Sequence, residues 1–426
     1  MRIAWFTHRY FPCIGGAENY GRAIVRRFVA DGHEVDVFTS NAHDLWYFTN
    51  PARRRLDEPS ESIVDGARVR RFEVRHFPFQ RYFGRLLSYM PHWPTQCVAE
   101  SYMPILPGIG QVRGDYDAVF AVGFPYTVFS YAAFRTARAA NAPLILTPFL
   151  HLSTPGDKVN RHYTRPHQIR LLAEADLIIT PTTMESRVIE GWGIPYARLL
   201  PMPMAIERDD VTGGDPRRLR SRLQIPADRP IVGQLGALDP NKGTNDLVRA
   251  VMRLNASRAD NPIHLVLAGA SSPDFEAFTA ELPEGTKRWL TLLGPLPPAD
   301  VPDFYAGLDI FAMPSRTDSF GIVYLEAWAN AKPVVAAAAG GVTEVVRNEE
   351  TGLLVPYGNL DRLGEALARL IDDPALAHRL GENGRELVES GYTWDDRYRT
   401  ILSRTRNVIG LAEPSSLPID RRRKAG

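Results

Sequence analysis

The chain has 426 residues, of which 44% are hydrophobic and 23% charged, and its formal net charge is +1. This composition is typical of a globular protein, and the near-zero charge excludes a general affinity for nucleic acid. At this length we expect two domains of about 200 residues each rather than one core.

The cysteines and the N-terminal segment indicate a reducing compartment. Cys13 and Cys97 lie far apart and match no metal-site spacing. Met1 and Arg2 lead directly into an apolar strand without a signal core, and no stretch approaches the ~18 apolar residues of a membrane span. We therefore expect a soluble, cytoplasmic protein.

Apolar β-rich runs alternate with amphipathic segments along the chain, as parallel sheets covered by helices require. The strands predicted in the first half are 2–8, 33–40, 67–74, 116–123, 143–150 and 175–182. Those predicted in the second half are 230–236, 263–269, 290–294, 309–315, 333–338 and 351–356. The first helix is predicted to open at Gly16 and to bury Tyr20, Ile24 and Phe28 at helical spacing.

This alternation predicts an α/β protein with two tandem Rossmann-like, doubly wound domains that face each other across a cleft. We assign residues 1–205 to the N-terminal domain and 206–393 to the C-terminal domain. The proline-, glycine- and charge-rich segment 202–219 is predicted as the linker, and 414–426 as a disordered tail.

Residues 314–341 are the most informative stretch. Asp318 lies in a loop at the C-terminal end of a predicted strand, and Glu326 lies two turns further on in the predicted helix 322–331. Two carboxylates at this spacing can face one crevice, at the edge where open α/β sheets bind ligands. Ionised carboxylates are strong hydrogen-bond acceptors, so we expect a polyhydroxylated ligand.

Three further loops fall at the C-terminal ends of predicted strands and carry Gly15 with Gly16, His151, and Lys242. Paired glycines before a helix let backbone N–H groups approach a phosphate. A lysine before a helix can neutralise an anionic leaving group, and His151 can position a hydroxyl. Each residue also has an alternative interpretation. The glycines can form a plain strand-to-helix turn, Lys242 can be solvated, and His151 can bond to nearby backbone. Glu326 can be an exposed helix residue.

Together these residues resemble glycosyltransferase family 4, which consists of retaining, nucleotide-sugar-dependent enzymes of the GT-B fold. The resemblance spans nearly the whole chain. Its motifs are Gly15-Gly16-x-Glu18, His151 after the fifth predicted strand, the loop Gly236 to Gly243, the signature from Asp318 to Ala327, and the Gly340-Gly341 turn.

The resemblance implies a hexosyltransferase with His151, Lys242 and Asp318 as catalytic residues. Lys242 would contact the donor diphosphate, Asp318 would hold hydroxyls of the transferred sugar, and Glu326 would bind the ribose. A helix over 394–413 would return to the N-terminal domain. The implied donor-binding set is Gly15, Gly16, Gly236, Lys242, Arg316, Asp318, Ser319, Phe320, Gly321, Ile322 and Glu326.

The resemblance also implies retention of anomeric configuration, with the leaving phosphate oxygen taking the proton of the acceptor. We expect no cofactor and no catalytic metal, so cationic side chains and helix termini would stabilise the leaving group. Asp115 and Asp117 have the spacing of the metal-binding pair in another class of sugar-transfer enzymes, but they begin a strand and so lie at the far edge of the sheet.

Two positions depart from the family pattern. Asp318 stands where the family usually has glutamate, and Ala237 stands where it usually has an arginine on the diphosphate. Losing such a charge can cost roughly 3 kcal/mol of transition-state stabilisation. We hypothesise that Arg316, or an arginine from the other domain, replaces it.

The segment 68–93 combines many aromatic rings with arginines and a single acid, Glu73. Such a surface suits anionic lipid headgroups, which predicts a lipid-linked or glycan acceptor and a peripheral contact with the inner face of a membrane. The alternative is that the rings pack an ordinary core while the arginines are solvated. The arginines are Arg68, Arg70, Arg71, Arg75, Arg81 and Arg85.

Two other functions remain open from the sequence. The missing arginine at Ala237 would suit a sugar-nucleotide-binding protein without turnover. A non-hydrolysing sugar-nucleotide epimerase shares the fold, although the Asp318 to Glu326 signature argues against it.

Overall fold

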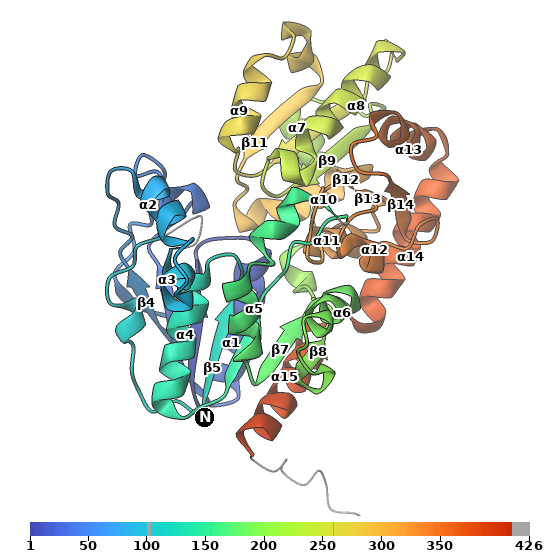
Figure 1. Ribbon diagram of the computed structural model, residues 1–426. Helices are drawn as coiled ribbons and strands as arrows, with labels where there is room; N and C mark the ends of the chain where they lie inside the picture. Colours follow the sequence, from blue (N-terminus) through green and yellow to red (C-terminus); the bar gives the residue numbers. More distant parts are fainter. Residues whose placement is uncertain (100–103, 155, 259, 411–426) are drawn as a thin grey trace, which may run out of the picture.

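The computed structural model describes residues 1–99, 104–154, 156–258 and 260–410. It consists of two α/β domains, each built on a largely parallel sheet (Figure 1). The predicted pair of Rossmann-like, doubly wound domains is therefore confirmed. The tail predicted over 414–426 lies outside the described residues. No helix among the described ranges is long and apolar enough to cross a membrane.

The N-terminal sheet has the strand order β3-β4-β2-β1-β5-β6-β7-β8 and is parallel except where β3 pairs with β4. Its strands are β1 (Arg2–Thr7), β2 (Glu34–Ser40), β3 (Glu61–Val64), β4 (Ala67–Phe72), β5 (Ala118–Val122), β6 (Leu144–Thr147), β7 (Leu177–Thr180) and β8 (Leu199–Pro201).

The C-terminal sheet is parallel, in the order β11-β10-β9-β12-β13-β14. Its strands are β9 (Ile231–Leu235), β10 (His264–Ala268), β11 (Leu290–Gly294), β12 (Ile310–Met313), β13 (Val334–Ala337) and β14 (Gly352–Val355). The six strands predicted for this half are all present.

The helices of the N-terminal half are α1 (Gly16–Ala30), α2 (Gln80–Leu87), α3 (Trp93–Val98), α4 (Thr127–Ala140), α5 (Pro166–Ala173) and α6 (Thr183–Gly191). Those of the C-terminal half are α7 (Pro216–Leu223), α8 (Thr244–Ala256), α9 (Pro273–Ala280), α10 (Val301–Gly307), α11 (Ile322–Ala329), α12 (Val342–Val345), α13 (Leu360–Asp372), α14 (Pro374–Gly391) and α15 (Trp394–Ile409).

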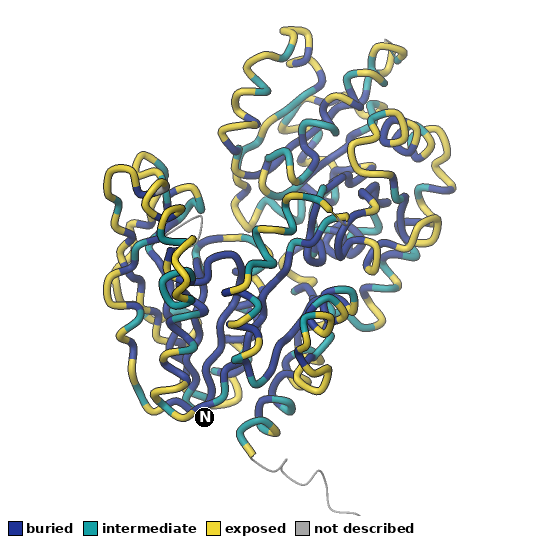
Figure 2. Tube along the Cα trace, in the orientation of Figure 1, coloured by how far each residue is buried: buried dark blue, intermediate teal, exposed yellow. Residues whose placement is uncertain are grey.

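The central strands form because both of their faces are buried, which gives continuous apolar runs. In β1, Ile3 and Trp5 belong to one apolar cluster, whereas Ala4 and Phe6 belong to the cluster on the opposite face. Figure 2 shows buried backbone running through both sheets. Successive side chains point to opposite faces of a strand, so each sheet supports a core on either side.

Each sheet reverses its winding direction at one place, between β1 and β5 in the first domain and between β9 and β12 in the second. At such a switch point, neighbouring strands send their connections to opposite faces and leave a crevice at their C-terminal ends. The loops after β1, β9 and β12 all begin at these crevices.

The chain crosses between the domains twice, and the two crossings lie side by side. The Ile206 amide donates to the carbonyl of Tyr392 at 3.4 Å, and Ile206 bridges to Thr393. Arg27 of α1 ties both crossings down through ion pairs of 2.7 Å to Glu207 and 2.7 Å to Asp395. The last helix, α15, then packs against α1.

The sequence prediction missed two short strands and underestimated the packing of the linker. Strand β3 is an edge strand with no fully buried side chain, and β8 has only three residues, so neither carries a clear apolar pattern.

In the segment 202–219, Met202, Met204 and Ile206 are buried. The linker is therefore part of the core at the crossing point.

Trp394 at the start of α15 gives a test of this bracing. Its side chain is 2% exposed and its ring lies 5.8 Å from that of Tyr20 in α1. We expect Trp394→Ala to lower the free energy of unfolding by about 3–5 kcal/mol, because it removes a large buried side chain. Chemical denaturation measures this, with Arg399→Ala on the exposed face of α15 as control. Equal unfolding midpoints for both variants would contradict the bracing role.

Candidate active site

Lys242 and Asp318 meet at the crevice of the C-terminal domain. The Lys242 ammonium lies 2.6 Å from Asp318 Oδ2, and the Asp318 side chain is almost fully buried. The pair forms because β9 and β12 are neighbours at the switch point, so the loops that follow them share one edge of the sheet.

The lysine loop is fixed by local contacts. The Asp239 carboxylate accepts hydrogen bonds from the amides of Asn241 and Lys242, at 2.7 and 3.0 Å. Gly243 has a φ of +70°, and a Cβ at this position would collide with the carbonyl of Pro314. Only glycine therefore lets the lysine loop approach the loop after β12 so closely.

The charges of the pair are mutually dependent. Burial by itself lowers the pKa of Lys242, but the attraction of Asp318 outweighs it and the net pKa is raised. Burial raises the pKa of Asp318, and the charge of Lys242 outweighs that effect and lowers it. Both groups are charged at neutral pH, since each supplies the counter-charge that the other needs in a buried place.

His151 joins this pair from the N-terminal domain, after β6. Burial, together with the nearby charge of Lys242, lowers its pKa to about 4. Its ring stacks on Tyr163 at a centroid distance of 5.3 Å. His151 is therefore neutral at physiological pH and offers a ring nitrogen for hydrogen bonding rather than a positive charge. The structure thus brings the three predicted catalytic residues together.

The loop that carries Asp318 is clamped between the two domains. The amide of Gly341 donates to the Asp318 carbonyl at 2.9 Å, and a Cβ on Gly340 would collide with the carbonyl of Leu152 in the N-terminal domain. The Thr317 hydroxyl also donates to Leu152, at 2.9 Å. The Gly340-Gly341 turn therefore contacts both the Asp318 loop and the N-terminal domain, and it keeps the two close together.

The backbone from Ser319 to Ile322 connects this loop to α11. Ser319 and Phe320 are buried, and Gly321, with a φ of +87°, precedes the first residue of α11. The Ile322 side chain lies 3.7 Å from the place that a Cβ on Gly16 would take. Gly16 and Ile322 therefore face each other across the domain boundary.

Glu326 lies in separate surroundings from the Lys242–Asp318 pair. It is buried rather than exposed, and its Oε2 accepts a 2.6 Å hydrogen bond from the Tyr305 hydroxyl. Burial raises its pKa. It lines a cavity of about 80 Å³ with residues of α1, of the crossing segment and with Trp394.

Arg316 is occupied by a partner that the sequence analysis did not consider. Its guanidinium donates to both carboxylate oxygens of Asp157 in the N-terminal domain, at 2.6 and 2.9 Å. These hydrogen bonds lower the pKa of Asp157 to about 2. Arg316 therefore ties the domains together at the edge of the site, and its proposed role on a diphosphate stays a prediction.

The Gly15-Gly16 turn serves an ion pair inside the N-terminal domain. Buried Glu18 is 2.7 Å from Arg9 and 3.3 Å from His8, and a Cβ on Gly15 would collide with its carboxylate. Burial raises the pKa of Glu18, but Arg9 and His8 outweigh it and the net pKa is well below the ordinary range. Arg9 is a cation at the ligand side of this domain that the sequence analysis missed, although Glu18 marks its position.

A second contact between the domains was also invisible in the sequence. The Glu344 carboxylate accepts hydrogen bonds from the amides of Thr183 and Met184 at the N-terminus of α6, at 2.8 and 2.6 Å.

Asp117 lies at the end of the first sheet opposite to the ligand side, as its position before β5 predicts, and it accepts a hydrogen bond from the Arg2 amide. Within the described ranges, no group of three histidine, cysteine or acidic residues is placed to hold a metal.

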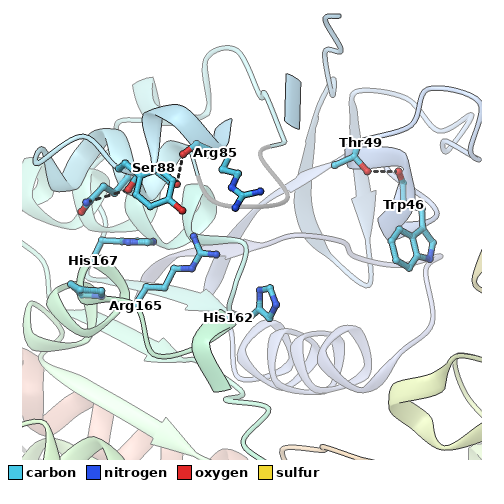
Figure 3. Close-up of a pocket in the computed structure, with 10 residues that line it drawn as sticks. Trp46, Thr49, Arg85, Ser88, His162, Arg165 and His167 are labelled. Carbon is cyan, nitrogen blue, oxygen red and sulfur yellow. Dashed lines mark hydrogen bonds between the residues drawn. The ribbon is translucent and has the colours of Figure 1, made fainter. Parts of the chain in front are cut away.

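A larger cavity of about 680 Å³ opens in the N-terminal domain, and Figure 3 shows the side chains around it. It lies at the C-terminal ends of the strands, and His162, adjacent in sequence to the Tyr163 that stacks on His151, lines it. It is lined by Trp46, Thr49, Arg85, Ser88, Tyr89, Gln96, His162, Arg165, Pro166 and His167.

Comparison with known proteins fits this geometry. Residues 15–205 match the family described as Glycosyl transferase 4-like domain, and residues 215–387 match the one described as Glycosyl transferases group 1. This chain belongs to glycosyltransferase family 4. The two matches leave out only the first strand, the boundary between the domains and the C-terminal region.

The glycosyltransferase is similar to the D-inositol 3-phosphate glycosyltransferase of Acidothermus cellulolyticus, with 27% identity over 93% of this chain and 86% of that protein. Sucrose-phosphate synthase from Thermosynechococcus elongatus has the same fold, with a TM-score of 0.71, 22% identity and coverage of 96% and 99% of the two chains. HepE of Anabaena, solved with UDP and glucose, has a TM-score of 0.69, 19% identity and coverage of 96% and 100%.

The depressed pKa of His151 predicts the pH profile of the glycosyltransferase. Because His151 is protonated only near pH 4 instead of its ordinary 6.5, we expect kcat/KM to show no His151 titration between about pH 5.5 and 7.5. Steady-state rates with a nucleotide sugar measure this, because its phosphodiester groups do not titrate in that range. An inflection near pH 6.5 that His151→Asn abolishes would contradict the neutral state of the imidazole.

The two roles open to Arg316 are separated by a pair of variants. If Arg316 stabilises the leaving group, Arg316→Ala should lower kcat by about 100-fold, because a preorganised cation is lost. Asp157→Asn should change kcat far less, since it keeps the arginine and removes only its carboxylate partner. Equal losses in the two variants would show that the pair acts only as a contact between the domains.

Proposed function

We propose that the enzyme transfers a hexose from a nucleoside diphosphate sugar to a phosphate-bearing or lipid-linked acceptor, with retention of anomeric configuration and without a metal. The observation that carries this proposal is the cluster of Lys242, Asp318 and His151 at the switch-point crevice. It combines a cation for a diphosphate, an acceptor for sugar hydroxyls and a neutral imidazole.

In the proposed reaction, the bond between the anomeric carbon and the distal phosphate oxygen breaks, and a bond from the acceptor hydroxyl oxygen to the same carbon forms. The leaving phosphate oxygen takes the proton of that hydroxyl. Lys242 neutralises the negative charge that grows on the phosphate. Asp318 holds sugar hydroxyls, and His151 orients the sugar from the other domain.

The donor nucleotide requires the domains to move. The cavity at Glu326, about 80 Å³, is far smaller than the roughly 300 Å³ at the lower end of ligand sites. We infer that this structure is a closed arrangement, and that a ribose reaches Glu326 when the cleft opens. The paired crossings at Ile206 and Tyr392 give such a movement a compact pivot.

The large cavity of the N-terminal domain is the proposed acceptor site. Arg85, Arg165, His162 and His167 line it, and the described residues that line it include no aspartate or glutamate. A site of this composition favours an anionic group, and the Trp46 and Tyr89 rings suit the apolar faces of a sugar or polyol. The name of the relative, D-inositol 3-phosphate glycosyltransferase, supports a phosphorylated polyol as the acceptor class.

A transfer assay in EDTA tests the proposal. With UDP-, GDP- and ADP-hexoses and a panel of phosphorylated and unphosphorylated polyols, we expect transfer that EDTA leaves unchanged, and a product whose anomeric configuration by NMR matches the donor. Lys242→Met should lower kcat by about 10²–10³-fold, because the leaving group loses its cation.

Lys242→Arg keeps the charge and serves as the matched control, with thermal unfolding checked for both variants because Asp318 would be left unpaired in the methionine variant. Nucleotide binding without transfer would indicate a binding protein instead. Conversion of the donor to its epimer without acceptor would indicate an epimerase. Loss of activity in EDTA that a divalent cation restores would contradict metal independence.

A further inference from the structure

Helix α2 and its flanks expose an apolar face. Phe79 is 72% exposed, Tyr82 76% and Leu86 67%. The spacing of these residues places them on one side of the helix, because positions three or four apart are neighbours on a helical surface. We call the following set the α2 face: Phe79, Tyr82, Phe83, Leu86, Tyr89 and Met90.

The opposite side of α2 holds the helix to the domain with small and polar groups. Gln80 is buried and donates a 3.1 Å hydrogen bond to the carbonyl of Phe48, and Gly84 is buried beside it. This is the reverse of an ordinary surface helix, which buries its apolar side. For these rings, the alternative of an ordinary core is therefore wrong.

Charge around the α2 face identifies its partner. Arg75 and Arg85 are exposed, and the sequence between Glu73 and Glu100 contains arginines but no aspartate or glutamate. An exposed aromatic face with a basic border is complementary to an anionic bilayer, where the rings enter the interface and the arginines contact phosphates. A protein surface of mixed charge would not require such a one-sided composition.

The α2 face is continuous with the proposed acceptor site. Arg85, Ser88 and Tyr89 line the 680 Å³ cavity, and they belong to α2 or to the turn after it. Figure 1 places α2 at the end of the N-terminal domain far from the N-terminus, and Figure 2 shows this region as mostly exposed. A bilayer in contact with the α2 face would therefore bring its lipid headgroups to the entrance of the cavity.

We propose that the α2 face is a membrane-docking surface that binds anionic phospholipid bilayers. The inference rests on the proposed function in one respect: the purpose of docking would be to present a lipid-linked acceptor to the cavity. The docking itself depends on the exposed rings and the arginines alone.

Vesicle sedimentation of the full-length protein tests the docking. Wild-type protein should sediment with vesicles of equal parts phosphatidylglycerol and phosphatidylcholine at low salt, and binding should fall when salt is raised or when phosphatidylcholine is used alone. The triple variant Phe79→Ser/Tyr82→Ser/Leu86→Ser should bind at least about tenfold more weakly, because it loses the apolar contacts.

A double variant, Tyr196→Ser/Leu292→Ser, removes exposed apolar side chains elsewhere, 51% and 45% exposed, and should bind vesicles like the wild type. Transfer to a water-soluble acceptor should be the same in the triple variant and the wild type, which separates docking from catalysis. If no acceptor is found, docking is still measured; if docking fails, transfer is still measured.

Three outcomes would overturn the proposal. Wild-type protein that leaves anionic vesicles in the supernatant at low salt would exclude the bilayer as partner. Equal binding by wild type and triple variant would place the contact elsewhere. Concentration-dependent dimers in size-exclusion chromatography that only the triple variant abolishes, without vesicle binding, would show that the α2 face joins two copies of the chain instead.

Discussion

The buried ion pair between Lys242 and Asp318 is the interaction on which the rest of the site depends. Each charge lies where it would be costly without the other, since an uncompensated buried charge costs several kcal/mol. The pair exists because β9 and β12 are neighbours at the point where the sheet reverses its winding. The pair holds a cation at the crevice of the C-terminal domain, and in the proposed reaction this cation binds the phosphates of the donor. The short loops, the Asp239 cap and the glycine at 243 serve to keep this geometry.

The arrangement of the two domains follows from contacts made by the same loops. Arg316 and Thr317, next to Asp318, bond to Asp157 and Leu152 of the other domain. Glu344 covers the N-terminus of α6, where unpaired amides and the helix dipole favour a carboxylate. Away from these loops, the two chain crossings between the domains lie side by side at Ile206 and Tyr392, where the domains can pivot. In the proposed opening of the cleft, these polar contacts would exchange their partners for water, while the packed crossings at Ile206 and Tyr392 would stay intact.

The N-terminal domain uses its strand ends differently from the C-terminal domain. Next to its switch point, Arg9 pairs with the buried carboxylate of Glu18 and also donates to the His43 carbonyl. Arginines and histidines also line the large cavity of this domain, and Arg85 of α2 is one of them. The division of chemistry is consistent with a donor held by one domain and an anionic acceptor received by the other.

The sequence by itself determined the fold class, the positions of twelve strands along the chain and the loops at their C-terminal ends. It could do so because strand periodicity is local, and because the direction of a parallel strand decides which loops lie on the ligand side. For that reason the sequence predicted that His151, Lys242 and Asp318 lie on the ligand side of their sheets, while their catalytic roles stay predictions. Tertiary structure alone decided which partners these loops meet: Asp157 for Arg316, a separate cavity for Glu326 and the neighbouring domain for the Gly340-Gly341 turn. It also decided that the rings of α2 face outward, since aromatic residues at helical spacing form the same pattern whether they face a core or solvent, and only the position of the helix on the domain distinguishes the two.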